Sequence, residues 1–210
     1  MSVYTPRPFA VRDDAAVARL FCDYAFATLV TPGDPEPLVS HLPLEHRADI
    51  GPKGSLLGHM ARANPHWRAF GTGPSVAMFH GPHAYISPSW YAEPATAVPT
   101  WNYAVAHVHG RVEIMTDEGE KRLLLDAMIR RYEGDRPQPW RLQLEGSSLA
   151  ALLDAIVGFR LTIERIDAKL KLSQNRSGED RERVIAALRG EGYADADASA
   201  EWMERYARER

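Results

Sequence analysis

Residues 102–115, NYAVAHVHGRVEIM, decide the fold class of this chain because their side chains alternate between two kinds. One set is small or apolar and comprises Ala104, Ala106, Val108, Val112 and Ile114. The other set is polar and comprises His107, His109, Arg111 and Glu113. Successive side chains of a strand point to opposite faces, so this period of two predicts one long, half-buried β-strand.

Shorter segments with the same extended character lie on both sides of this stretch. The turn cluster Pro32-Gly33-Asp34-Pro35 separates two of them and predicts that they pair as a hairpin. Apolar runs bounded by turn residues predict the remaining strands. Besides residues 102–115, the expected strands are residues 26–31, 38–46, 55–60, 75–80, 84–87 and 159–166.

Helices are expected before, between and after these strands. Asp13 can cap the first helix, and Asn64 followed by Pro65 is a typical helix start. The expected helices are residues 13–24, 64–70, 118–132 and 149–156, with a charged helical tail from residue 180. This order predicts an α+β fold that is mainly β: a closed or nearly closed antiparallel barrel with peripheral helices.

Composition indicates a soluble globular protein. The chain has 210 residues, of which 45% are hydrophobic and 25% are charged. We expect one main domain over residues 1–176 and a C-terminal helical extension over residues 177–210. The formal net charge of −3 argues against a surface that grips DNA through its phosphates.

The single cysteine and the N-terminus predict a compartment. Cys22 has no second cysteine to pair with, and its place in a helical pattern predicts a small buried hydrophobe. The N-terminal residues lack the apolar run of a signal peptide, and no stretch approaches the roughly 20 apolar residues of a membrane span. We therefore expect a cytoplasmic protein without a membrane partner.

Two histidines, His107 and His109, share one face of the long strand, a spacing that suits a metal ion. Zinc sites use three or four protein ligands, and the sequence offers no obvious third one. A polar strand face with hydrogen-bonded histidines is therefore favoured, and no metal is expected. The phosphate loop of nucleotide hydrolases and the nucleophile elbow of α/β-hydrolases are both absent from the sequence.

A candidate anion site lies in residues 58–67, GHMARANPHW, where a strand leads into a helix start. Backbone N–H groups at such a start attract an anion, and His59 and Arg62 can add positive charge. The alternative is an Asn-capped helix with solvated basic residues.

Three further runs carry residue types that suit a planar ligand. Residues 81–91, GPHAYISPSWY, and residues 98–103, VPTWNY, combine rigid prolines with hydroxyls and flat aromatic rings. An aromatic mini-core that pins a long loop explains these two runs equally well. Residues 169–176, KLKLSQNR, can surround an anion or a flavin's carbonyl groups and ring nitrogens, or can form a solvated charged exit from a strand.

Together these segments resemble the PaiB family of FMN-binding negative transcriptional regulators. The runs that carry the resemblance span nearly the whole chain: YTP (4–6), TLV (28–30), SHLP (40–43), GHMARANP (58–65), FHGPHAYISPSWY (79–91), VPTWNY (98–103) and KLSQNR (171–176). The resemblance implies an FMN-binding split β-barrel related to pyridoxamine phosphate oxidases and flavin reductases. It also implies a homodimer with FMN in the groove between two barrels.

The same resemblance implies three groups of FMN-binding residues, some of them supplied by the partner subunit. Beside the flavin ring it implies the strand with Ser40, His41 and Leu42. Around the phosphate it implies His59, Met60, Ala61, Arg62 and Asn64. Near the ring it implies Ser87, Ser89, Trp101 and Gln174, and Lys171 belongs to the same cofactor-binding set.

The leading functional hypothesis is an FMN-binding regulatory protein. It would act through the flavin or another small ligand, such as a nicotinamide, because the sequence has no helix-turn-helix with a basic recognition face. One alternative is a flavin-dependent oxidoreductase, in which His41, His83 or His107 could protonate a substrate. Another is a haem-binding split-barrel protein, since related barrels hold haem and the chain has eight histidines.

Overall fold

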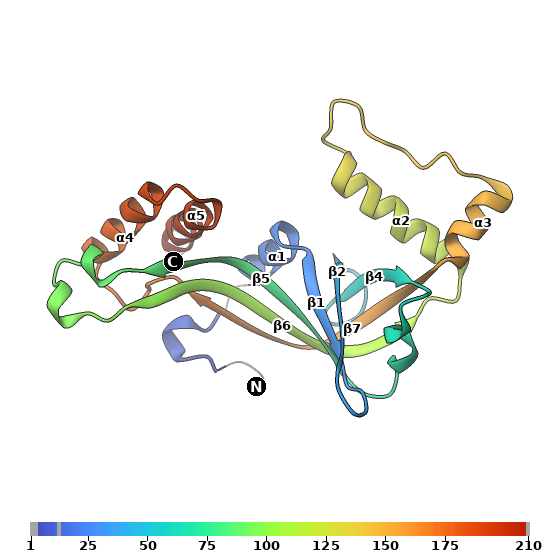
Figure 1. Ribbon diagram of the computed structural model, residues 1–210, viewed down its shortest axis with the longest axis horizontal. Helices are drawn as coiled ribbons and strands as arrows, with labels where there is room; N and C mark the ends of the chain where they lie inside the picture. The colour runs from blue at the N-terminus through green and yellow to red at the C-terminus, as the bar shows by residue number, and fades with distance from the viewer. Residues whose placement is uncertain (1–3, 12–13, 209–210) are drawn as a thin grey trace. The chain divides into compact units, whose positions relative to one another are not determined.

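The computed structural model describes residues 4–11 and 14–208 of the chain (Figure 1). Within these residues seven strands form one sheet in the order β2-β1-β5-β6-β7-β4-β3. The strands are β1 (Phe26–Thr31), β2 (Leu38–Pro43), β3 (Glu45–Arg47), β4 (Ser55–Ala61), β5 (Ser75–Ile86), β6 (Thr100–Ile114) and β7 (Ile156–Lys171). This sheet and the helices around it confirm the predicted α+β class.

The helices occur at the start, middle and end of the chain, as predicted. They are α1 (Asp14–Asp23), α2 (Glu118–Glu133), α3 (Gly146–Asp154), α4 (Gly178–Gly190) and α5 (Ala194–Arg208). The short 3-10 helices are η1 (Arg7–Phe9), η2 (Pro65–Ala69), η3 (Pro88–Trp90) and η4 (Pro94–Thr96). Asp13, the predicted cap of the first helix, lies outside the described residues. No helix in the described part of the chain is long and apolar enough to cross a bilayer.

The strand pairing follows the antiparallel pattern. β1 and β2 form the predicted hairpin, with Phe26 opposite Pro43 and Thr31 opposite Leu38. β1 also pairs with β5, and β4 pairs with both β3 and β7. In the last of these pairs, Ser55 lies opposite Thr162.

The long strand β6 buries alternate residues from Asn102 to Val112, which confirms the predicted period of two. The predicted apolar face does not continue to Ile114, which is 41% exposed, whereas Met115 is buried. The pattern shifts because the strand ends there: the N–H of Met115 donates to the carbonyl oxygen of Gly158 at 2.8 Å.

Several predicted strand boundaries are wrong. Residues 38–46 form two strands because the segment changes partner at Leu44: β2 pairs with β1, whereas β3 pairs with β4. The strand predicted over residues 159–166 is longer at both ends. Its first residue is Ile156, at which the sequence predicted a helix end.

Residues 75–80 and 84–86 belong to one strand rather than two, and Ser87, predicted as a strand residue, caps η3 instead. Within β5, His80 is exposed, Gly81 and Pro82 are both buried, and His83 is exposed again. Two consecutive buried residues indicate a β-bulge, where a proline without an N–H group disturbs the ladder least. The bulge therefore brings His80 and His83 to the same face of the strand.

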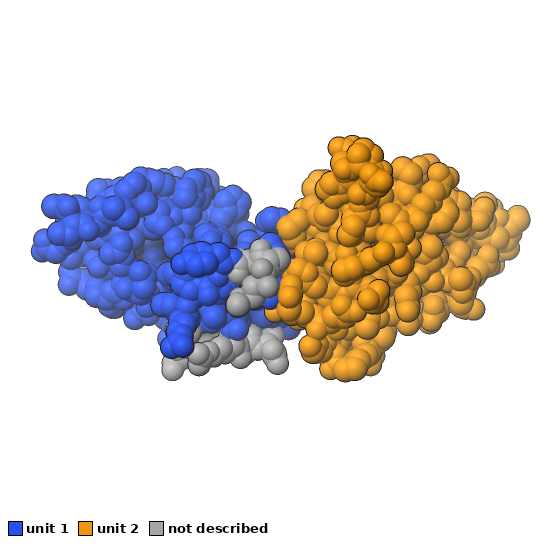
Figure 2. All heavy atoms as spheres, turned by 90° about the horizontal axis from the view of Figure 1, so that it is seen from below, with its two compact units in different colours: residues 1–24, 79–107, 167–210 blue, residues 25–78, 108–166 orange. Residues whose placement is uncertain are grey.

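The chain divides into two compact units (Figure 2). The first comprises residues 1–24, 79–107 and 167–210, and the second comprises residues 25–78 and 108–166. Three long strands, β5, β6 and β7, contribute residues to both. The domain boundary at residue 176 stays a prediction.

In the first unit, α1 packs on β5 through Leu20 and Phe21, which are both 1% exposed. The ring centroid of Phe21 lies 4.5 Å from that of Phe79. A Cβ atom on Gly81 would lie 2.6 Å from a Leu20 methyl carbon, so this close packing requires glycine. Cys22 is exposed, and the prediction that it is buried is wrong because the buried stripe of α1 runs through the two residues before it.

In the second unit, backbones and side chains approach each other closely at two glycines. A Cβ atom on Gly110 would lie 2.0 Å from the carbonyl oxygen of Thr162, so only glycine fits where β6 meets β7. A Cβ atom on Gly58 would lie 2.8 Å from the ring of Phe159. A smaller cluster joins this sheet to α2 and contains Leu57, Met115, Leu124 and Met128.

Candidate functional site

The predicted cofactor residues fall into both units. The second unit holds Ser40, His41, Leu42, His59, Met60, Ala61, Arg62 and Asn64. The first unit holds Ser87, Ser89, Trp101, Lys171 and Gln174. Each group is described by its own contacts below.

A polar cluster in the second unit joins Ser40 to Asn64 and His66. The Asn64 Nδ2 group donates to Ser40 Oγ at 3.0 Å, and Ser40 Oγ lies 2.8 Å from His66 Nδ1. The Asn64 Oδ1 atom accepts the backbone N–H of His66 at 3.0 Å, which caps η2 and fixes the orientation of the amide. We call these three residues the Ser40 cluster.

The Ser40 cluster is buried and holds a neutral histidine. His66 is 2% exposed, and burial lowers the pKa of its imidazole below the usual value. Because Ser40 Oγ already accepts from Asn64, its own hydrogen is available to donate to His66 Nδ1. That arrangement leaves the proton of the imidazole on Nε2, a buried atom without a hydrogen-bond partner among the described residues.

The neighbours of Ser40 on β2 alternate as a strand requires. His41 is exposed, and its Nδ1 atom lies 3.1 Å from the Thr28 hydroxyl. Leu42 is buried, and a Cβ atom on Gly58 would lie 3.2 Å from its side chain. Of the three predicted ring-side residues, only His41 therefore presents its side chain to a ligand on the exposed face.

The segment predicted to hold the phosphate carries less free charge than expected. His59 is largely buried, which lowers the pKa of its imidazole and keeps the ring neutral at pH 7. Arg62 donates to the carbonyl oxygens of Asp154 and Ile156, and its guanidinium lies 3.3 Å from the Asp154 carboxylate. The η2 helix that follows has five residues. The phosphate role of this segment stays a prediction.

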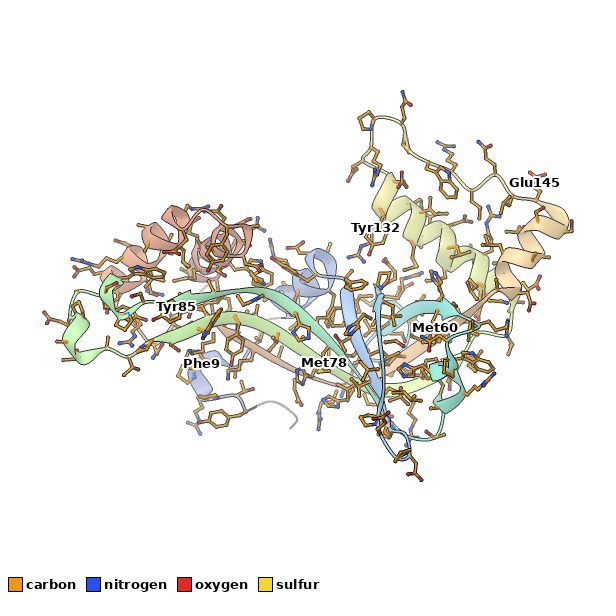
Figure 3. All side chains as sticks on the ribbon, in the orientation of Figure 1. Phe9, Met60, Met78, Tyr85, Tyr132 and Glu145 are labelled. Carbon is orange, nitrogen blue, oxygen red and sulfur yellow. The ribbon has the colours of Figure 1, made fainter. Side chains whose placement is uncertain are left out.

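Two other residues of the segment predicted to hold the phosphate, Met60 and Ala61, differ in exposure. Met60 (Figure 3) is 6% exposed and belongs to the core. Ala61 is exposed at the end of β4. The Nδ1 atom of His59 is buried and has no hydrogen-bond partner within the described chain. An unpaired buried nitrogen of this kind is available to a ligand.

In the first unit, three predicted residues form local contacts. The Ser87 and Ser89 hydroxyls lie 2.7 Å apart, and Ser87 also caps η3 by accepting the N–H of Ser89. Gln174 braces a turn: its Oε1 atom accepts the N–H of Leu172 at 2.7 Å, and its Nε2 group donates to Leu170. Both ends of the Gln174 amide are therefore occupied.

Lys171 and Trp101 are brought together at the ends of β7 and β6. The Lys171 Nζ atom donates to the carbonyl oxygen of Trp101 at 2.7 Å and to the Thr100 hydroxyl. Burial lowers the pKa of this ammonium group, and the positive charges of Lys169 and Arg176 lower it further.

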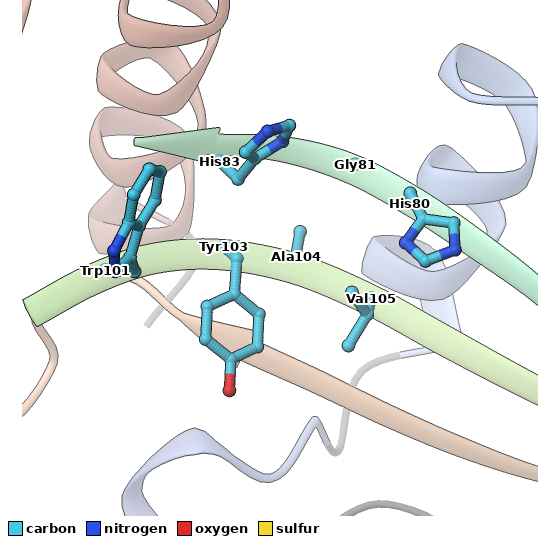
Figure 4. A pocket seen from close by; sticks show the side chains of 7 residues that line it. All are labelled: His80, Gly81, His83, Trp101, Tyr103, Ala104 and Val105. Atoms are coloured by element: carbon cyan, nitrogen blue, oxygen red, sulfur yellow. The ribbon is translucent and has the colours of Figure 1, made fainter. Parts of the chain in front are cut away.

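An aromatic hollow lies beside these residues on the face of β5 and β6 (Figure 4). Its volume is about 550 Å³, and it is lined by His80, Gly81, His83, Trp101, Tyr103, Ala104 and Val105. Trp101 is half exposed, and its ring centroid lies 6.2 Å from that of His83 and 6.1 Å from that of Tyr85. The face thus offers flat rings to a ligand.

Sequence reasoning selected Trp101 but omitted His80, Tyr103 and Val105 from the cofactor set. Tyr103 and Val105 are signalled by the period of two, since they follow Trp101 on the same face of β6. His80 is signalled only if the bulge at residues 81–82 is recognised. In the described residues, no three His, Cys, Asp or Glu side chains gather as a metal site.

The match to protein families decides the assignment. Residues 3–165 match the family described as "Putative FMN-binding domain".

The chain belongs to this FMN-binding family.

A relative supports the more specific resemblance to PaiB. The Bacillus subtilis protein named "Protease synthase and sporulation protein PAI 2" is 38% identical over 205 residues, which cover 96% of this chain and 97% of that protein. The similarity to PAI 2 thus extends over nearly the whole of both chains.

Solved structures place this family member in the split-barrel fold. The flavocytochrome Anf3 of Azotobacter vinelandii has a TM-score of 0.63 at 17% identity, covering 83% of this chain and 73% of that one. The FAD and haem binding protein of Mycobacterium smegmatis has a TM-score of 0.61 at 20% identity, covering 88% and 80%. The predicted FMN-binding split-barrel fold is confirmed.

The family assignment makes FMN the cofactor, and the residues present fit it. FMN joins an anionic phosphate to a planar ring with carbonyl and N–H groups. Lys171 supplies a cation whose hydrogen bonds go to neutral oxygens, and His59 supplies a buried nitrogen without a protein partner. The aromatic hollow supplies flat apolar walls. Cationic and neutral polar groups suit the phosphate and the ring carbonyls of the cofactor, and the flat walls suit its ring.

Proposed function

We propose that this chain is an FMN-binding regulatory protein of the PaiB type that works as a cytoplasmic homodimer. The observation that carries the proposal is the match of residues 3–165 to the FMN-binding family, together with 38% identity to PAI 2 over nearly the full length of both chains. The single cysteine, which forms no internal disulfide, suits a reducing compartment.

In this proposal, the residues that the resemblance implies hold FMN, and some of the contacts come from the partner subunit. Ser40, His41 and Leu42 lie beside the flavin ring, and the segment from His59 to Asn64 holds the phosphate. Ser87, Ser89, Trp101, Lys171 and Gln174 complete the site near the ring. When bound, FMN supplies a ring that can accept and release electrons, while the protein positions the ring and limits its access to water.

The proposed regulator acts through the flavin or a small ligand, such as a nicotinamide, rather than by gripping DNA. The net charge is −3, and three arginines of the last two helices are paired with acids. These pairs are Arg183 with Glu179, Arg189 with Glu204, and Arg205 with Glu201, at 2.7 to 3.2 Å. Such pairing leaves little of the basic potential that phosphate contacts require.

An FMN titration of the purified full chain tests the proposal. We expect the flavin absorption bands to remain with the protein through gel filtration, at the mass of a dimer by light scattering. A monomer that retains no FMN contradicts the proposal. Tight, sequence-selective binding of operator DNA by the purified dimer contradicts the indirect mode of regulation.

Two arginine variants sharpen this test. Arg62 and Arg47 are both exposed, and each is paired with an aspartate, at 3.3 Å and 2.7 Å. If Arg62 contacts the phosphate, Arg62→Gln weakens FMN binding at least about tenfold, the usual size of a charge-assisted hydrogen bond. The matched control Arg47→Gln leaves FMN affinity unchanged. Equal affinities of the two variants would remove Arg62 from the site.

A further inference from the structure

Three cations at the end of β7 have no carboxylate partner within the described residues. Lys169 is 7% exposed, and its ammonium donates to the carbonyl of Tyr4 at 2.9 Å. Lys171 donates to two neutral oxygens, and the Arg176 guanidinium lies 4.3 Å from the centroid of the Tyr91 ring. We call Lys169, Lys171 and Arg176 the basic triad.

Such an arrangement is unfavourable for the folded chain alone. Lysine and arginine are seldom buried without an opposite charge, because moving a cation out of water is costly unless it is paired. Lys169 is buried, and Lys171 and Arg176 are half-buried. The positive charges of Lys169 and Arg176 add to the effect of burial in lowering the pKa of Lys171. An anion beside the triad would offset the repulsion among its three positive charges.

The triad also has hydrogen-bond donors to spare. An ammonium group has three N–H donors, and two of those of Lys171 are used within the described chain. A guanidinium that stacks on an aromatic ring keeps its N–H groups pointing outward in its own plane, where they can bind an oxyanion. Arg176 stacks in this way on Tyr91.

The triad shares residues with the aromatic hollow. The backbone carbonyl of Trp101 binds Lys171, and the Trp101 indole lines the hollow. Tyr103 also lines the hollow, and its ring centroid lies 5.2 Å from the Lys169 ammonium. On the β5 side, His83 lies 3.9 Å from the Asp195 carboxylate. Flat apolar rings are therefore next to unneutralised positive charge.

We infer that this face binds a small ligand with an anionic group on a planar aromatic ring. The ring lies in the hollow against Trp101 and Tyr103, and the anionic group pairs with Lys171 and Arg176. Each part of the ligand matches a part of the face: an apolar ring replaces water over the aromatic side chains, and the anion supplies the missing negative charge.

Two sources can supply this chemistry: the flavin cofactor itself, or a separate aromatic acid that acts as effector or substrate. Trp101 and Lys171 are in the proposed FMN set; if the source is FMN, the inference rests on the proposed function and reassigns the phosphate from the segment between His59 and Asn64 to Lys171 and Arg176. It stands without FMN if the source is a second ligand.

The test is calorimetric titration of the full chain with naphthoate and with its uncharged analogue, naphthalenemethanol. We expect naphthoate to bind at least about tenfold more tightly than the alcohol, because only the acid can pair with the triad. In Lys171→Met, which keeps most of the aliphatic stem, the affinity for naphthoate falls about tenfold and the preference for the acid disappears. The matched control is Lys53→Met, because Lys53 is an exposed lysine that also donates to a backbone carbonyl.

Repeating the titration on FMN-saturated protein distinguishes the two sources. Naphthoate binding that persists with FMN bound identifies a separate aromatic acid. Competition between FMN and naphthoate, with weaker FMN binding in Lys171→Met, identifies the flavin. Naphthoate binding without any FMN binding refutes the proposed function and leaves this inference standing.

Three outcomes overturn the inference. The first is no binding of naphthoate by the wild-type chain, with or without FMN. The second is equal affinity for the acid and the alcohol. The third is a loss of dimer mass in Lys171→Met but not in Lys53→Met, with no naphthoate binding in either variant. That result would make a second copy of the chain the occupant of this face.

Discussion

The Ser40 cluster of the second unit and the basic triad of the first differ in how their polar groups are satisfied. Ser40, Asn64 and His66 bind one another, and their one histidine is neutral. Lys169, Lys171 and Arg176 are charged alike and bind only neutral oxygens or aromatic faces. Both groups are near the ends of strands, and both include residues predicted to hold the cofactor.

The Ser40 cluster therefore supports the fold, whereas the basic triad is suited to bind a ligand. An uncharged network of mutual hydrogen bonds stabilises its surroundings, since removing one member leaves a buried polar group of another unpaired. Like charges without counter-charge weaken the fold unless something outside the described chain neutralises them. Loss of a cluster member should therefore reduce stability, and loss of a triad member should reduce binding.

The largest expected effect is that of His66→Ala. The substitution empties a buried site and leaves the Ser40 hydroxyl hydrogen without its acceptor, so the free energy of unfolding falls by about 3 kcal/mol. Urea denaturation measures this loss. The matched control is His80→Ala: His80 is an exposed histidine, and its removal changes the free energy by less than about 0.5 kcal/mol. Equal losses in both variants would show that the Ser40 cluster does not support the fold.

A smaller effect is expected from pH. Burial lowers the folded-state pKa of His46, His59 and His66 below the 6.5 of the unfolded chain. Below pH 6.5 the histidines of the unfolded chain bind protons that those of the folded chain do not bind. The stability that these neutral rings contribute is therefore present above that pH and is lost as the pH falls. Urea denaturation at about pH 7.5 and about pH 5.5 measures the loss.

The His66→Gln variant provides the comparison for this pH effect. Its stability should fall less between the two pH values than that of the wild-type chain, because one of the three histidines is gone. An identical fall in both proteins would show that His66 is not held neutral by the fold.

Much of the fold was predictable because it depends on local pattern. The period of two in β6 and the turn cluster between β1 and β2 are properties of neighbouring residues, and both predictions are confirmed. The continuous β5 was not predictable in this way, because Gly81-Pro82 normally marks a turn. These two residues stay in the strand through tertiary packing, which includes Leu20 of α1 against Gly81.

The candidate site was predictable in its residue types but less so in its contacts. Ser40 and Asn64 were selected through the family resemblance, but the bond from Ser40 to His66 joins residues 26 apart in sequence. Lys171 was selected as well, whereas its lack of a carboxylate depends on which acids the fold brings near. The partners of a charge are a tertiary property, and no sequence period signals them.

The free energy of unfolding of Lys171→Met, measured by urea denaturation without ligand, tests the central contrast most directly. If the basic triad is held for a ligand, removing one of its charges leaves the stability unchanged or raises it by roughly 1 kcal/mol. A fall of about 2 kcal/mol or more would contradict the account, because Lys171 would then support the fold in the way that His66 does.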